Sequence, residues 1–220
     1  METINTRRNR FSEAVVQRLR AIRVPIGLIV ITLLGLLAWW IVPGVGPLVA
    51  LRSARAIAPF EIVDIPSLVI QLATYWLVPV DLKSWFEISW AVLLMSFILG
   101  ERMTNRTYVL SLAIGAGTGG VAFIVTGPDA LLIGPTMAGH GLLGFYCLAT
   151  LRMWRTLHLV SKLFSLWVYA VLGYILLSTL TEPPSTRIAE AVAAILSFVV
   201  ATRLVPPRPR TISGERDADG

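Results

Sequence analysis

Charged residues and metal-binding side chains are scarce in this sequence of 220 residues. Only 15% of the residues are charged, whereas about 25% is usual in a water-soluble domain, which argues against a soluble protein. The single cysteine, Cys147, can form neither an intrachain disulfide nor a paired-cysteine metal site. Two histidines make a multi-histidine metal centre improbable, and no glycine-rich nucleotide-binding pattern occurs. We therefore expect no metal ion and no cofactor.

Apolar residues, in contrast, make up 55% of the chain and fall into blocks of about 16 to 24 residues separated by short polar stretches. A helix needs about 20 such residues to cross a bilayer. Hydropathy and flanking charges therefore predict an all-α, polytopic membrane protein. Its six expected spans cover residues 24–42, 86–101, 108–126, 130–150, 163–180 and 188–204.

A 16-residue apolar run between Asp64 and Asp81 could form a further short span or a re-entrant or interfacial element. Because basic residues favour the cytoplasmic side of a membrane, their distribution separates these cases. With six spans, 15 basic residues lie inside and four outside, whereas a seventh span gives 8 inside and 11 outside. We expect six spans with both termini in the cytoplasm. Arginine accounts for 17 of the 19 basic residues, which is typical of a GC-rich bacterial source, so we expect a plasma-membrane location.

The two ends of the chain differ from the apolar middle. Residues 1–23 carry six arginines and are predicted to be a basic cytoplasmic segment. This segment could be an amphipathic helix on the lipid surface or a solvated anchor for the first span. Residues 24–204 would form the transmembrane domain. Residues 205–220, proline-rich and then polar, are predicted to be a disordered cytoplasmic tail.

One stretch of the fourth span, GPTMAGHGLLG from Gly134 to Gly144, resembles the fourth helix of rhomboid intramembrane serine proteases. That family's pattern is G-x-S-G-x-x-x-G-L-L-G, in which the serine is the nucleophile. The glycines and leucines at both ends match without a gap, but Thr136 stands at the serine position and Met137 at the following glycine. The resemblance implies a six-helix bundle with a membrane-embedded loop between the first two helices, here residues 57–83.

The resemblance also implies that the catalytic residues have been replaced. Counting back from Glu101, which matches an acidic landmark of the family, places Trp85 and Ser89 at the positions of its two oxyanion-stabilising side chains. In the sixth span, Glu190 stands where the catalytic histidine belongs. A hydroxyl needs an adjacent base to become a nucleophile, and its tetrahedral intermediate needs positioned donors. With Thr136 these are four degenerate positions, and we expect no catalysis.

Small residues in the fourth and sixth spans are expected to let these helices pack closely. Those that follow the rhomboid-like pattern are Gly134, Gly141, Gly144, Ala193 and Ser197.

The few polar residues inside these spans are predicted to form one interior cluster of Thr136, His140 and Glu190. His140 lies one helical turn after Thr136, so both can share a face, and the resemblance places His140 against Glu190. Such a cluster could be a relic site, a proton relay or a weak threonine hydrolase with His140 or Glu190 as base. The alternative is a hydrogen-bonded pair that only holds two helices together. Glu101 is expected to pair with arginines at the cytoplasmic interface.

Three hypotheses about function follow. The first is a non-catalytic rhomboid-like protein, a pseudoprotease, that binds transmembrane helices of partner proteins in the bilayer. The second is a divergent intramembrane hydrolase that uses Thr136. The third is a small transporter or lipid-handling protein, for which Pro135 could break the fourth span. Net charge is explained by topology, so we expect no nucleic-acid partner, and the oligomeric state is left open.

Overall fold

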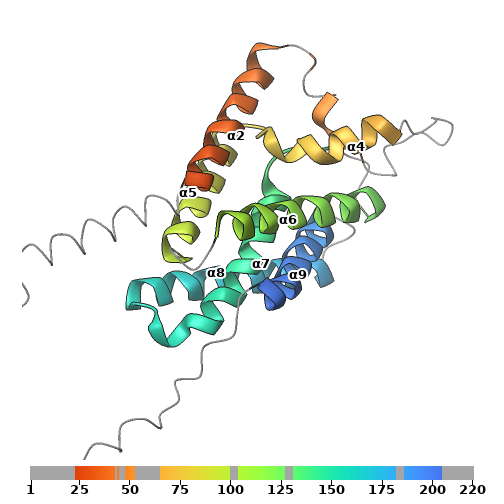
Figure 1. Ribbon diagram of the computed structural model, residues 1–220. Helices are drawn as coiled ribbons and strands as arrows, with labels where there is room; N and C mark the ends of the chain where they lie inside the picture. The colour runs from red at the N-terminus through yellow and green to blue at the C-terminus, as the bar shows by residue number, and fades with distance from the viewer. Residues whose placement is uncertain are drawn as a thin grey trace, which may run out of the picture.

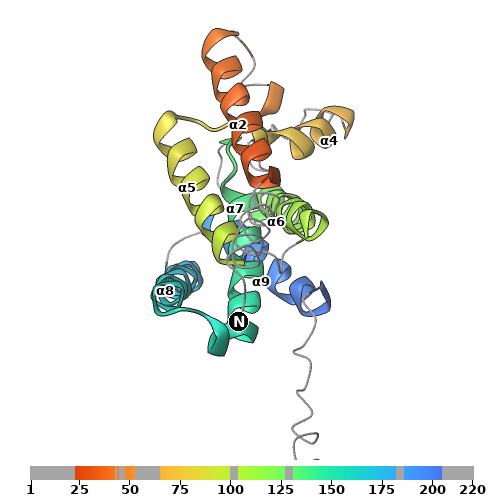
Figure 2. The ribbon, with the colours of Figure 1, turned by 60° about the vertical axis from the view of Figure 1, so that its left-hand side comes forward.

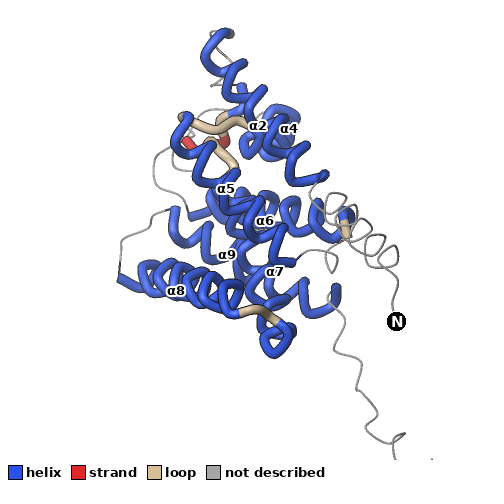
Figure 3. The backbone as a smooth tube through the Cα atoms, turned by 90° about the vertical axis from the view of Figure 1, so that its left-hand side faces the viewer, coloured by secondary structure: helices blue, strands red, loops and turns tan. Residues whose placement is uncertain are grey.

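The computed structural model describes residues 23–42, 44, 48–52, 65–99, 104–126, 131–181 and 186–204. Helices make up nearly all of this part of the chain (Figures 1 and 3). The α-helices are α2 (Arg23–Ile41), α4 (Ile65–Thr74), α5 (Leu82–Leu99), α6 (Asn105–Thr126), α7 (Thr136–Met153), α8 (Leu159–Thr181) and α9 (Thr186–Leu204). Two short 3-10 helices are η1 (Tyr75–Leu77) and η3 (Trp154–Thr156). The two-residue strands β1 (Leu51–Arg52) and β2 (Leu131–Leu132) pair antiparallel.

Four of these helices, α2, α5, α6 and α8, are long and apolar enough to cross a membrane. Large apolar side chains on them, such as Leu34 and Leu163, are exposed. Contiguous exposed apolar surface of this kind suits lipid rather than water. The chain therefore has the helices of a membrane-embedded protein. The segments predicted as the fourth and sixth spans also form helices, α7 and α9, but these are not among the four.

Helix α7 lies at the centre of the structure, where α6, α7 and α9 all pack against one another (Figures 1 and 2). Glycines make the close approaches possible. A Cβ atom on Gly115 of α6 would lie 2.5 Å from the Cα atom of Gly141, and a Cβ atom on Gly144 would collide with the carbonyl oxygen of Ala194 in α9. Without Cβ atoms the backbones touch, which is how helices gain dispersion contacts in lipid.

Polar side chains join α7 to α8 on its other side. The Tyr146 hydroxyl lies 2.9 Å from that of Ser165, and the Thr150 hydroxyl lies 2.7 Å from that of Tyr169. Interhelical hydrogen bonds of this kind add modest stability in a membrane, on the order of 1 kcal/mol each.

The described part of the segment between α2 and α5 contains strand β1, helix α4 and the 3-10 helix η1. Helix α4 has ten residues, so it is about 15 Å long, against a hydrocarbon core of about 30 Å. It is too short to span, which removes the short-span alternative for this apolar run. The buried Tyr75 that follows donates a hydrogen bond of 2.8 Å to the Ala116 carbonyl and so fastens the segment to α6.

The fourth predicted span begins later than expected. Residues 131–132 are strand β2, and α7 starts only at Thr136. Gly134 has a φ of +110°, a conformation that glycine adopts at little cost, and it makes the turn into the helix. A Cβ atom there would lie 4.0 Å from its nearest neighbours, so Gly134 forms the turn rather than a close helix contact. Pro135 precedes the first residue of α7 and does not break it.

Helix α5 begins with a capping interaction. The Asp81 carboxylate accepts a hydrogen bond of 2.6 Å from the Ser84 backbone amide, which satisfies one of the unpaired amides of the first turn. That bond, together with one from the Ser84 side chain, holds the pKa of Asp81 below its ordinary value.

Several sequence-based expectations lie outside the described residues. They are the structure of residues 1–22, the pairing of Glu101, the part of the predicted loop at residues 57–64, and the tail from residue 205.

Candidate polar site between α7 and α9

His140 and Glu190 meet where α7 packs against α9. Nε2 of His140 lies 4.0 Å from Oε2 of Glu190, and the two side chains are only 15% and 8% exposed. His140 sits in the second turn of α7, and Glu190 sits one turn into α9, so the helix contact itself brings them together. Two of the three residues of the predicted cluster therefore lie side by side in the protein interior.

The hydrogen bond of the other imidazole nitrogen fixes the roles in this pair. Nδ1 of His140 lies 2.8 Å from the Thr136 carbonyl oxygen. A carbonyl can only accept, so Nδ1 carries a proton and a neutral ring leaves Nε2 as an acceptor. Nε2 then faces an acceptor oxygen of Glu190. The contact is attractive when a proton lies on either group, on Nε2 as imidazolium or on the carboxyl, and at 4.0 Å it is an electrostatic contact rather than a hydrogen bond.

Arg187 completes the cluster, and the sequence analysis did not include it. Its guanidinium donates to Oε2 of Glu190 at 2.9 Å and lies 5.7 Å from the ring centre of Tyr174 on α8. The sequence could have indicated this contact, because Arg187 lies three residues before Glu190 and residues three apart on a helix are neighbours on its surface. A partly exposed cation and a buried carboxylate thus connect α8, α9 and α7 through one chain of contacts.

Thr136 takes part through its backbone rather than its hydroxyl. Its carbonyl oxygen holds the His140 ring. Its hydroxyl makes no hydrogen bond with any described residue, and so none with His140 or Glu190. A nucleophilic hydroxyl and its base are normally within about 3 Å of each other. The expected three-membered side-chain cluster is therefore a pair, with the threonine beside it.

A cavity of about 170 Å³ opens between α5 and α7 beside this pair. Its polar lining comes from Glu87, Thr136 and His140, and the remainder of the wall is apolar. Gly139 also lines it, and a Cβ atom there would meet nothing within 4 Å. The space is large enough for a few waters or a small side chain.

The α5 residues predicted to correspond to oxyanion donors lie elsewhere. The Trp85 indole donates a hydrogen bond of 3.3 Å to the Ile29 carbonyl of α2, and the buried Ser89 does not line the cavity. Glu87 and Ala91, four residues apart, line it instead. Glu87 is exposed and lies 3.9 Å from Lys83. Ile88, Val92 and Met95 also line the cavity, so the cavity-lining face of α5 is turned by about one residue, roughly 100°, from the face that holds Trp85 and Ser89.

The remaining packing residues of the sequence analysis lie at helix contacts. Gly141 and Gly144 touch α6 and α9, and a Cβ atom on Gly119 would lie 3.0 Å from that of Ala193. Ser197 is 1% exposed, and its hydroxyl has no hydrogen-bond partner among the residues that the structure describes.

In the part of the chain that the structure describes, no group of three or more His, Cys, Asp and Glu side chains could hold a metal ion. The side chains of the polar site are therefore one histidine, one carboxylate and one guanidinium. Comparison of the chain with protein-family models, curated proteins and solved structures finds no match.

Proposed function

We propose that this chain is a six-span, rhomboid-like pseudoprotease that holds transmembrane helices of partner proteins in the plasma membrane without cutting them, with both termini in the cytoplasm. The support is that three structural features follow one another along the chain in the order that the rhomboid-like pattern would have. A short apolar helix, α4, separates the first two long helices, and the glycine motif of α7 packs against α6 and α9. Glu190 lies opposite His140, where the rhomboid-like pattern would have its catalytic histidine.

The observation that carries the non-catalytic part of the proposal is the bonding of Thr136. Its hydroxyl bonds to neither His140 nor Glu190, and the His140 ring is held by the Thr136 carbonyl with Nε2 turned toward α9. Without a hydrogen-bonded base, a threonine hydroxyl stays protonated near neutral pH and is a poor nucleophile. Trp85, bonded to α2, supplies no donor to an oxyanion here.

The test uses a defined transmembrane substrate. The purified protein is reconstituted in liposomes with a standard rhomboid substrate, and both binding and cleavage are measured, with a catalytically active rhomboid protease as positive control. We expect association without cleavage, at the same level in wild type and Thr136→Ala. Cleavage by wild type that Thr136→Ala abolishes would overturn the proposal.

One observation favours a second candidate, the divergent hydrolase. The cavity of about 170 Å³ places Thr136 and His140 on one wall, where a peptide carbonyl could reach the hydroxyl. In that case His140→Ala would reduce cleavage as strongly as Thr136→Ala, because both would act in one step. Equal, background-level activity of all three proteins would reject this candidate.

A further inference from the structure

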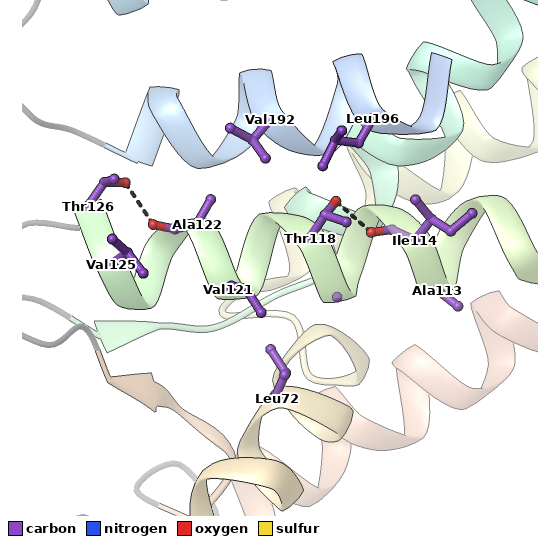
Figure 4. A pocket seen from close by; sticks show the side chains of 11 residues that line it. Leu72, Ala113, Ile114, Thr118, Val121, Ala122, Val125, Thr126, Val192 and Leu196 are labelled. Atoms are coloured by element: carbon purple, nitrogen blue, oxygen red, sulfur yellow. Dashed lines mark hydrogen bonds between the residues drawn. The ribbon is translucent and has the colours of Figure 1, made fainter. Parts of the chain in front are cut away.

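An open apolar groove of about 600 Å³ runs between α6 and α9, with Leu72 of α4 at one side (Figure 4). It is separate from the polar site, which lies between α7 and α9. Gly117 forms part of its wall, and a Cβ atom there would meet nothing within 4 Å. The groove is therefore open space along α6 that no described side chain fills.

The walls of the groove offer nothing polar to a ligand. Its two threonines use their hydroxyls within α6: Thr118 donates to the Ile114 carbonyl and Thr126 to the Ala122 carbonyl, each at 2.7 Å (Figure 4). The other lining side chains are hydrocarbon. The part of an occupant inside the groove must therefore be apolar, since a buried polar group without a partner is costly.

Two arginines extend the groove walls at one end. Arg106 lies seven residues before Ala113 on α6, and Arg203 lies seven residues after Leu196 on α9. A spacing of seven keeps each on the face of its helix that lines the groove, about 10 Å beyond it.

The two arginines lie at the same end of the groove because α6 and α9 run antiparallel. Figure 4 shows this direction: Val192 lies over Ala122, and Leu196 lies over Thr118, farther toward the start of α6. Both Arg106 and Arg203 are exposed, and neither guanidinium pairs with a carboxylate in the described ranges. The open apolar groove thus has two exposed positive charges beyond the same end.

We propose that this groove binds one anionic phospholipid, with its phosphate between Arg106 and Arg203 and an acyl chain lying along Gly117 and Val121. Arginine guanidinium groups bind phosphate oxygens with paired hydrogen bonds. Basic pockets between membrane helices are typical sites for anionic headgroups. The distance along α6 from Arg106 to Val121 is about 22 Å, which matches one leaflet of a bilayer that is about 40–45 Å thick with its headgroups.

The headgroup half of the proposal is tested by native mass spectrometry of the purified protein in detergent, with phosphatidylglycerol and phosphatidylcholine of identical acyl chains. We expect a preference for phosphatidylglycerol of roughly 30-fold, since each arginine near an anionic headgroup contributes roughly five-fold. The double variant Arg106→Gln/Arg203→Gln should lose nearly all of this preference. The control Arg155→Gln, exposed in η3 and away from the groove, should keep it.

The acyl-chain half is tested by filling the groove. Gly117→Leu should weaken phosphatidylglycerol binding about ten-fold or more, and Gly173→Leu on α8, which also has open space around it, should not. Free glycerol phosphate should compete only weakly.

Four results would overturn the proposal: no preference between the two lipids, an equal loss in Arg155→Gln, lipid binding unchanged by Gly117→Leu, or glycerol phosphate competing as strongly as the lipid. If Gly117→Leu left lipid binding unchanged and changed the oligomeric state, the groove would be a contact for a second copy of the chain.

Discussion

Replacing Gly144 by alanine should destabilise the protein, although alanine is the better helix former. The preference of a helix interior for alanine over glycine contributes about 0.5–1 kcal/mol in favour of the variant. Against this, the new methyl group meets the Ala194 carbonyl oxygen of α9, and a backbone group cannot rotate away as a flexible side chain could. Overpacking of this kind costs about 1–3 kcal/mol. Since the contact is severe, we expect a net loss of roughly 1–2 kcal/mol.

The measurement is thermal or denaturant unfolding in one detergent, followed by tryptophan fluorescence. Gly173→Ala in α8 is the matched control, because a Cβ atom at Gly173 meets nothing within 4 Å. It should be neutral or more stable by up to about 1 kcal/mol. The reasoning would be refuted if Gly144→Ala were as stable as Gly173→Ala, since α7 and α9 would then not touch at this position.

Three further predictions concern single interactions. Tyr75→Phe removes the buried hydrogen bond to α6 and should lower the free energy of unfolding by about 1 kcal/mol, measured by the same unfolding assay. Glu190→Gln should cost roughly 1–3 kcal/mol, less than for a fully buried pair because Arg187 is 34% exposed. The cost should shrink in the Arg187→Gln background, and equal costs in both backgrounds would show that the pair is not coupled. Because the Ser84 amide lowers the pKa of Asp81, the stability advantage of wild type over Asp81→Asn should be full at neutral pH. It should decline as the pH falls through about 3.9 toward the lowered native pKa, and an advantage unchanged at low pH would contradict the cap.

The helices themselves were predictable because each long apolar block is bounded by polar or helix-ending residues. The start of α7 was not, since apolar Leu131 and Leu132 continue the hydropathy of the fourth block although they form a strand. Here the local geometry of Gly134 and Pro135 decides the boundary, and hydropathy does not register it.

The orientation of side chains was harder to predict than the helices. The few polar residues of helix α5 form no continuous stripe, so its sequence does not show which face turns toward α7. Trp85 and Ser89 lie outside the cavity wall, whereas Glu87 lines it. The contact of His140 with Glu190 was implied by the resemblance to the rhomboid pattern and not by the hydropathy of α7 or α9.

The most direct test of the central claim is labelling of the purified protein with a fluorophosphonate probe, which reacts with activated hydroxyl nucleophiles. An active rhomboid protease under the same conditions is the positive control, and Thr136→Ala is the matched variant. Because the Thr136 hydroxyl bonds to neither His140 nor Glu190 in the structure, wild type is expected to label no more than Thr136→Ala. Labelling of wild type that disappears in Thr136→Ala would contradict the account.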